Sequence, residues 1–333
     1  MPSLHFERVS ILGGGAWGTA LAATCLWAGR TVNLWCRSET VAASLSSGRG
    51  HPTRLDGLDL PEIPSSTDLS QTAGADIILS VVPAQASRDT LIAAAAHIAP
   101  GTPVVMCAKG VERGSLKLMA DVLVETVPQA CPAVLSGPSF AADVARGLPT
   151  AVTLACTDEA IGRTLVEAIG RPAFRPYWTS DLIGAEIGGA VKNVLAIACG
   201  ITEGLGLGRS AHAALIARGF SELRRLALAM GARETTLSGL CGLGDLVLTC
   251  SSSQSRNMSL GLTIGQLGSA DAALSAQSQL TEGVSTAPGV LALAKQYNIE
   301  MPICAAVADV LSRAVTVAEA IENLLDRPFT EEF

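Results

Sequence analysis

The chain has 333 residues, of which 49% are hydrophobic and 16% are charged, and its formal net charge at pH 7 is −7. This length is sufficient for two domains of ordinary size, each with a large buried core. The acidic balance excludes the broad electrostatic attraction on which nucleic-acid-binding proteins depend, so any anionic ligand needs a local binding site.

The first 180 residues alternate short apolar stretches with helical stretches. We expect a helix at about 17–28, and strands at 8–12, 32–35, 76–82, 104–108, 133–136 and 151–155. Short apolar strands that are separated by helices predict a mostly parallel sheet covered on both faces.

From residue 181 onward we find no segment with strand character. Residues 179–181 are suited to capping a helix, and glycine-rich or serine-rich loops at 239–244 and 251–255 interrupt the helical stretches. We expect helices at 181–201, 211–230, 256–267, 285–297 and 303–325. The sequence therefore predicts an α/β domain over residues 1–180 and an all-helical domain over residues 181–333.

Cysteine, histidine and hydropathy patterns restrict the class of protein further. The nine cysteines include no C-x-x-C pair, which is typical of reduced thiols in a cytoplasmic protein. The four isolated histidines form no H-E-x-x-H motif, so no metal site is expected. We expect no signal peptide, because residues 1–8 contain no apolar signal core before the first predicted strand. We expect no membrane-spanning segment, because no uninterrupted run of about 18 apolar residues occurs.

A glycine motif, G-x-G-x-x-G, follows the first predicted strand at Gly13, Gly15 and Gly18. In a dinucleotide-binding loop the first glycine permits a tight turn, the second admits a pyrophosphate, and the third allows close packing of helix on sheet. The motif alone is common, but its place between a strand and a helix predicts dinucleotide binding. Trp17 either covers the pyrophosphate or packs against the sheet.

The residues after the second predicted strand bear on the choice of cofactor. NAD-specific loops usually place an acidic residue there, whereas this chain has Arg37, followed by Glu39 two residues later. A guanidinium group can hold the 2′-phosphate of NADP, so Arg37 favours NADP while leaving NAD use open. The alternative is a solvated loop arginine.

Lys192 is the most informative residue of the helical half. It and Asn193 are the only polar side chains in the apolar stretch 187–201. A buried lysine has a lowered pKa and is suited to general acid/base catalysis. The alternative is a structural lysine, which either forms an ion pair in the core or extends its ammonium group to the surface. At about 3.6 residues per turn, Lys192 shares its face with small residues that leave room for a ligand, namely Ala185, Gly188, Gly189, Ala196 and Cys199.

Further polar residues stand where ligands bind in α/β proteins. Lys109 follows a predicted strand, and Ser139 follows the next and is expected to cap a helix. Asp245 is expected to cap a helix and also to pair with a buried cation such as Lys192. Ser255, Arg256 and Asn257 at a helix start are suited to a phosphate. The alternative is that Lys109, and likewise residues 255–257, are solvated residues at the surface.

The motifs taken together resemble the bacterial NAD(P)-dependent glycerol-3-phosphate dehydrogenases, over nearly the whole chain. The segments that carry the resemblance are 13–18 (GGGAWG), 108–110 (AKG), 136–141 (SGPSFA), 188–193 (GGAVKN), 242–246 (GLGDL) and 254–257 (QSRN). The resemblance implies a Rossmann domain followed by a helical domain like the C-terminal domain of 6-phosphogluconate dehydrogenase. It also implies a cytoplasmic homodimer that reversibly reduces dihydroxyacetone phosphate to sn-glycerol 3-phosphate, a phospholipid precursor, with NADP or NAD.

The resemblance assigns residues as well. Lys192 would be the proton donor and acceptor. Independently of the resemblance, Gly188 and Gly189 lie one turn before Lys192 on the same helix face, and we expect them to leave space for substrate and nicotinamide. Substrate contacts would come from Lys109, Gly137, Ser139, Lys192, Asp245, Ser255, Arg256 and Asn257. Cofactor contacts would come from Gly13, Gly15, Ala16, Trp17, Gly18, Arg37, Lys109, Ala141, Arg256, Leu280 and Glu282.

Three positions depart from the family pattern or vary within it. Ala16 stands where a serine is common, which removes one hydroxyl from the phosphate site. Leu280 replaces a valine, so its cofactor contact is open, and the position of Arg37 varies in the family.

Two rival functions remain. Another two-domain reductase, of the 3-hydroxyacid or ketopantoate type, would need a carboxylate site and explains residues 255–257 less well. A catalytically silent dinucleotide sensor would need the glycine loop, but it has no use for Lys192, Lys109 and Asp245.

Overall fold

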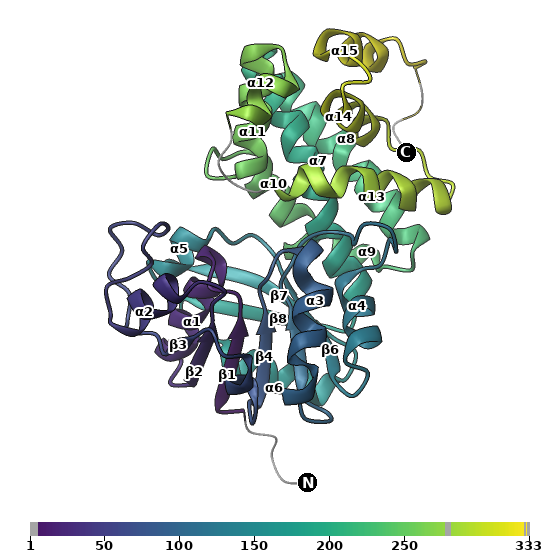
Figure 1. Cartoon of the computed structure of the whole chain (residues 1–333). Helices are drawn as coiled ribbons and strands as arrows, with labels where there is room; N and C mark the ends of the chain where they lie inside the picture. The colour runs from purple at the N-terminus through teal and green to yellow at the C-terminus, as the bar shows by residue number, and fades with distance from the viewer. Residues whose placement is uncertain (1–5, 277–280, 330, 332–333) are drawn as a thin grey trace.

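The computed structural model describes residues 6–276, 281–329 and 331. An eight-stranded sheet and its helices form one half of the molecule, and a cluster of helices forms the other (Figure 1). The strands are β1 (Arg8–Leu12), β2 (Thr31–Trp35), β3 (Ser65–Ser66), β4 (Ile77–Ser80), β5 (Pro103–Met106), β6 (Cys131–Ser136), β7 (Thr150–Cys156) and β8 (Phe174–Thr179).

The strand order places the topological switch point of the sheet at β1. The order is β3-β2-β1-β4-β5-β6-β7-β8, and every neighbouring pair is parallel except β6 and β7. The chain leaves β1 toward β2 on one side and returns with β4 on the other. Ligands bind at such a switch point, outside the carboxyl ends of the strands.

Helices cover both faces of the sheet, as the sequence predicts. On one face α1, α2, α5 and α6 share a buried apolar cluster with the sheet, and on the other α3 and α4 do so. The bounds are α1 (Ala16–Trp27), α2 (Glu39–Ser46), α3 (Ala84–Ala94), α4 (Met119–Thr126), α5 (Ala141–Ala145) and α6 (Glu159–Ile169), with short 3₁₀ turns at Leu69–Thr72 and Ala95–His97.

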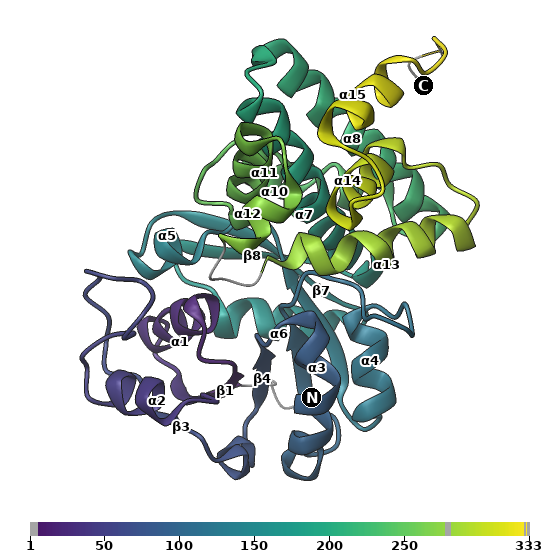
Figure 2. The same ribbon diagram turned by 45° about the horizontal axis from the view of Figure 1, so that its top comes forward.

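The helical half is built around α7 (Leu182–Gly204), which is surrounded by the helices that follow it (Figure 2). Asp181 caps α7 by accepting a hydrogen bond from the N–H of Gly184 at 2.9 Å. The other elements are α8 (Gly208–Ala229), α9 (Glu234–Leu237), a π-helical turn (Leu240–Gly244), α10 (Asp245–Cys250), α11 (Arg256–Leu267), α12 (Ala270–Ser275), α13 (Glu282–Gln296), α14 (Pro302–Ser312) and α15 (Val317–Leu325).

Glycines let α7 and α11 approach each other closely. A Cβ atom at Gly200 would stand 2.2 Å from the carbonyl oxygen of Met258, and one at Gly261 would stand 2.1 Å from that of Ile197. Gly204 and Gly265 repeat this contact one turn later. Because only hydrogen atoms separate the two backbones, larger residues here would push α11 away from α7.

Several sequence predictions of local structure are confirmed and others are wrong. The strand at 8–12 and the helix at 256–267 have the predicted bounds, and no strand lies after residue 181 within the described residues. Strands β3 and β8 and helices α9, α10 and α12 were not predicted. The single helix expected at 303–325 is in fact two helices, because the chain turns at Arg313, whose φ is 67°.

Helix α7 is long and apolar enough to cross a membrane, judged by length and composition alone. However, 89% of its most apolar 18-residue window is buried inside the protein. Its apolar character is therefore explained by its place at the centre of the helical core.

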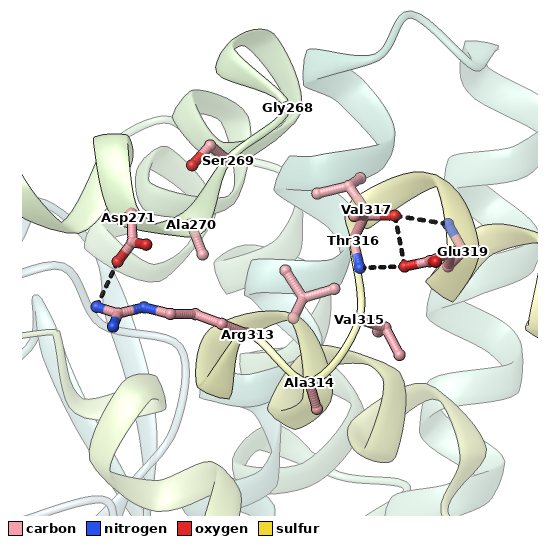
Figure 3. A pocket seen from close by; sticks show the side chains of 11 residues that line it. Gly268, Ser269, Ala270, Asp271, Arg313, Ala314, Val315, Thr316, Val317 and Glu319 are labelled. Atoms are coloured by element: carbon pink, nitrogen blue, oxygen red, sulfur yellow. Dashed lines mark hydrogen bonds and ion pairs between the residues drawn. The ribbon is translucent and has the colours of Figure 1, made fainter.

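A cavity of about 240 Å³ lies at the far end of the helical half, beside the turn that joins α14 to α15 (Figure 3). Asp271 and Arg313 form an ion pair across it, and Thr316 and Glu319 form the capping box that begins α15. The polar groups of these four residues are thus paired with one another. The turn and the helix cap account for the cavity without a ligand.

Glu186 connects the two halves of the molecule. It lies on α7, is buried, and accepts a hydrogen bond at 2.8 Å from the N–H of Ala120 in the first turn of α4. Burial raises the pKa of this carboxyl to about 8.

This shift predicts a pH-dependent stability. The folded state holds the proton of Glu186 more tightly than the unfolded chain, so the free energy of unfolding should fall as the pH rises from about 4.5 to about 8. Glu186→Gln mimics the neutral acid and should remove this component, whose steepest slope is about 1.4 kcal/mol per pH unit.

Urea unfolding of both proteins between pH 5 and 8 measures the difference. Glu167→Gln, at an exposed position of α6, is the matched control and should leave the pH dependence unchanged. Parallel curves for the wild type and Glu186→Gln would show that the shift is absent.

Candidate active site

The glycine loop after β1 has the geometry that its motif predicts. Gly13 has a φ of 121°, and a Cβ atom there would lie 3.0 Å from the backbone of Val81. A Cβ atom at Gly18 would lie 1.9 Å from the carbonyl oxygen of Gly13, so α1 packs tightly on the loop. At Gly15, which precedes α1, a Cβ atom would meet nothing within 4 Å. The loop thus leaves open space at the start of α1, which fits a pyrophosphate.

Other predicted cofactor residues surround this loop. Ala16 is the first residue of α1, and Ala141 is the first residue of α5. The ring of Trp17 lies 6.5 Å from that of Phe174 on β8, which favours packing against the sheet for this residue. Arg37 is exposed just beyond β2.

A cluster of two lysines and one aspartate joins the two halves of the molecule. Asp245, only 1% exposed, accepts hydrogen bonds from the Lys192 ammonium through Oδ1 and from the Lys109 ammonium through Oδ2 at 2.8 Å. Lys109 comes from the loop after β5, Lys192 from α7 and Asp245 from the start of α10. The ion pair predicted between Asp245 and a buried cation is confirmed.

Lys192 has the altered acidity that a proton donor needs. It is 6% exposed, and burial lowers the pKa of its ammonium to about 8. The negative Asp245 opposes this shift and the positive Lys109 adds to it. Thr249, one turn after Asp245 on α10, accepts a hydrogen bond from Lys192 at 2.9 Å, so the ammonium is held by two partners.

Two asparagines extend this cluster to α11 and α13. The Asn193 amide donates to the carbonyl oxygen of Lys109 at 3.1 Å, and its oxygen accepts from the Asn257 amide at 3.0 Å. The oxygen of Asn257 accepts in turn from the N–H of Gly283 at 2.9 Å. This relay fixes the start of α11 relative to both lysines.

The start of α11 presents the residues expected to bind a phosphate. Ser255 caps the helix by accepting from the N–H of Met258 at 3.2 Å. Arg256 is its first residue and is exposed. Glu282 lies on α13; burial raises the pKa of its carboxyl, while the positive charges of Arg256, Lys109 and Lys192 lower it. These cations and Glu282 therefore share one region.

The loop after β6 differs from its predicted role. Ser139 does not cap the following helix, because α5 is preceded by Phe140 without a side-chain cap. The Ser139 hydroxyl instead donates to the carbonyl oxygen of Gly137 at 3.0 Å. The same oxygen accepts from Lys109 at 3.1 Å, so this loop belongs to the lysine cluster. The predicted capping role of Asp245 is also wrong, since its carboxylate is used by the two lysines.

The small residues around Lys192 contact protein, contrary to the expectation of space for a ligand. A Cβ atom at Gly188 would stand 2.4 Å from the carbonyl oxygen of Cys241, and one at Gly189 would stand 2.8 Å from Oγ of Ser136. Ala185, Ala196 and Cys199 are fully buried. These residues are small because other elements pack closely on α7.

Sequence reasoning did not assign Asn193 and Thr249 to the site. A signal existed for each: Asn193 is the other polar residue of the apolar helix, and Thr249 lies four residues after Asp245, on the same helix face. Leu280 lies outside the described residues.

Two family models match most of the chain. That of the NAD-dependent glycerol-3-phosphate dehydrogenase N-terminus matches residues 8–162, and that of the C-terminus of the same enzyme matches residues 181–322.

Curated relatives agree. The glycerol-3-phosphate dehydrogenase [NAD(P)+] of Maricaulis maris is 56% identical over 98% of this chain and 99% of its own length. The enzyme of that name from Caulobacter vibrioides is 57% identical over 99% of this chain and 100% of its own length.

Comparison with solved structures distinguishes a member of the same family from a protein that shares only the fold. The crystal structure of glycerol-3-phosphate dehydrogenase from Coxiella burnetii has a TM-score of 0.91, with 38% identity over 97% of this chain and 99% of its own. A ketopantoate reductase from Ralstonia eutropha has a TM-score of 0.60 and 16% identity, over 92% of this chain and 98% of its own, which is a likeness of fold alone. With both halves matched and relatives of this similarity, the chain belongs to the NAD-dependent glycerol-3-phosphate dehydrogenase family.

Proposed function

We propose that this protein catalyses the reversible NAD(P)H-dependent reduction of dihydroxyacetone phosphate to sn-glycerol 3-phosphate, and that it supplies glycerophospholipid synthesis. The observation that carries the proposal is the buried cluster of Lys192, Asp245 and Lys109, in which Lys109 follows the carboxyl end of β5, a strand of the same parallel part of the sheet as β1 with its glycine loop. A cofactor sensor without catalysis would not need this cluster.

A nicotinamide cofactor, when bound, would supply the hydride needed at C2 of the substrate. Lys192 donates the proton to the C2 oxygen and is left as a neutral amine, which takes the proton back in the reverse reaction. The positive charges of Lys192 and Lys109 stabilise the developing alkoxide. Lys192 is suited to this exchange because burial brings its pKa to about 8, near neutral pH.

Asp245 holds both ammonium groups in place. Its two oxygens bind Lys192 and Lys109 separately, so one carboxylate fixes the distance between the two cations. Asp245 and Thr249 therefore position the donor, while Lys109, Gly137 and Ser139 complete the substrate site.

We assign the substrate phosphate to Ser255, Arg256 and Asn257. The N-terminus of α11 carries a partial positive charge, and the exposed guanidinium of Arg256 adds a full one. The asparagine relay from Asn193 supports this assignment, because it ties the phosphate site to Lys109 and keeps the reacting carbon near Lys192.

We assign the cofactor to the glycine loop and its surroundings. The pyrophosphate would lie at Gly13, Gly15, Ala16 and Gly18, and Arg37 would hold the 2′-phosphate of NADP, so we favour NADP over NAD. Trp17, Lys109, Ala141, Arg256 and Glu282 would line the remainder.

We further propose a cytoplasmic homodimer with domains divided between residues 180 and 181. The division is supported by β8, which ends at Thr179, and by α7, which begins at Leu182. All nine cysteines are free, as in a reducing compartment. The exposed Leu205 and Leu207 between α7 and α8 offer apolar surface to a second copy.

Removing the proton donor tests the mechanism. Lys192→Met keeps the volume of the side chain and leaves Asp245 paired with Lys109. We expect kcat for dihydroxyacetone phosphate to fall by roughly 10²–10⁴-fold, while calorimetry shows unchanged NADPH affinity. Near-normal turnover would exclude Lys192 as the acid.

The same lysine predicts opposite pH profiles for the two reaction directions. Reduction needs the ammonium, so its kcat should fall as the pH rises through about 8. Oxidation of sn-glycerol 3-phosphate needs the neutral amine, so its kcat should rise over the same range. The absorbance of NADPH at each pH measures both, and profiles of the same sign would contradict the assignment.

Arg256→Ala tests the phosphate site. Loss of a charged hydrogen bond of about 1.5–3 kcal/mol predicts a KM for dihydroxyacetone phosphate that is raised roughly 10- to 100-fold. The matched control is Arg209→Ala, which removes an exposed arginine of α8 and should leave this KM unchanged. If unphosphorylated dihydroxyacetone were reduced by the wild type equally well, no phosphate site would exist.

Arg37→Ala tests the choice of cofactor. We expect the KM for NADPH to rise roughly tenfold or more while that for NADH stays within twofold, because only NADPH carries the 2′-phosphate. The control is Arg49→Ala, at an exposed position shortly after α2, which should leave both KM values unchanged. An unchanged ratio of the two KM values would refute the role of Arg37.

A further inference from the structure

His51 touches the glycine loop although it belongs to no motif of the sequence. It lies in the segment between α2 and β3 and is only 8% exposed. Its Nε2 is 2.9 Å from the carbonyl oxygen of Gly14, the residue between the first two glycines of the motif. Its Nδ1 is 3.3 Å from the backbone nitrogen of Thr53.

These two contacts determine which nitrogen of the His51 ring carries the proton. The N–H of Thr53 can only donate, so Nδ1 must accept and carries no proton. The carbonyl oxygen of Gly14 can only accept, so Nε2 carries the proton and donates. Burial lowers the pKa of His51, and the nearby charge of Arg54 acts in the same direction, against the hydrogen bond to Gly14. The ring is therefore neutral, with both nitrogens in use.

The bond to Gly14 determines where the next N–H group points. In a trans peptide the C=O and N–H bonds point in opposite directions. With the Gly14 oxygen held toward His51, the N–H of Gly15 points away from His51. A Cβ atom at Gly15 would meet nothing within 4 Å, so there is open space beside this residue.

The other side of Gly14 is closed. A Cβ atom there would lie 2.3 Å from Sγ of Cys36, which immediately precedes Arg37. Gly14 therefore has Cys36 against its α-carbon and His51 on its carbonyl oxygen, and the peptide has little freedom to rotate. The orientation of this peptide matters because Ala16 offers no hydroxyl to the cofactor. The pyrophosphate site therefore depends on backbone N–H groups.

We propose that His51 is a positioning residue for cofactor binding, which fixes the Gly14–Gly15 peptide so that the N–H of Gly15 faces the pyrophosphate. The inference rests on the proposed function, because it concerns the same dinucleotide. It adds a neutral histidine from outside the glycine motif to the groups that determine cofactor affinity.

The test compares two substitutions by titration calorimetry without substrate. His51→Phe keeps a ring but removes the donor, and should weaken NADPH binding roughly 2- to 10-fold, the equivalent of one neutral hydrogen bond. His51→Gln places an amide donor near Nε2 and should restore most of the affinity. His97→Phe, on the 3₁₀ turn after α3, is the matched control and should bind as the wild type does.

A fragment comparison locates the effect on the cofactor. His51→Phe should weaken ADP-ribose, which carries the pyrophosphate, by the same factor. It should leave 2′-AMP, which lacks the pyrophosphate, unchanged. Equal weakening of both would place His51 at the adenosine end and overturn the proposal.

Two further results would also overturn it: wild-type affinity in His51→Phe, or a loss in His51→Gln as large as that in His51→Phe. Kinetics give an independent measure, since the KM for NADPH should rise while kcat and the KM for dihydroxyacetone phosphate stay within twofold. Failure of the wild type to reduce dihydroxyacetone phosphate would refute the proposed function alone, because the binding titrations need no substrate.

Discussion

One buried carboxylate organises this protein. Asp245 is almost fully inaccessible and binds two ammonium groups that come from different halves of the chain. Burying any of these charges alone would cost several kcal/mol, so each needs the others. The loop after β5, the middle of α7 and the start of α10 must therefore meet at one point. We propose this point as the place where Lys192 meets the substrate carbonyl.

The packing of α7 serves this arrangement. Glycines at 200, 204, 261 and 265 bring α11 against α7, and the two asparagines bind across the gap. Small residues near Lys192 admit the π-helical turn and the loops of the sheet. Close packing and hydrogen bonds thus hold the first residues of α10, α11 and α13 near Lys192.

The sequence predicted the elements that have strong patterns. Short, mainly apolar runs between turn residues identify β1, β4 and β7, because strands buried on both faces carry few polar side chains. The edge strand β8 was missed because Pro176 argues against a strand in the sequence, although the sheet tolerates a proline at its edge. The break at Arg313 was missed because the apolar pattern continues on both sides of it, and the backbone conformation there leaves no trace in hydropathy.

The sequence by itself determined which chemical groups are available: a glycine loop, a lysine in an apolar helix, and a serine, arginine and asparagine at a helix start. These follow from local patterns, since helix caps, strands and tight turns depend on near neighbours in the chain. Only the tertiary structure decided that Lys109 and Lys192 share Asp245, that Ser139 binds Gly137 instead of capping α5, and that His51 holds the glycine loop. These contacts join residues whose distance in space depends on the packing of whole elements, which local patterns do not encode.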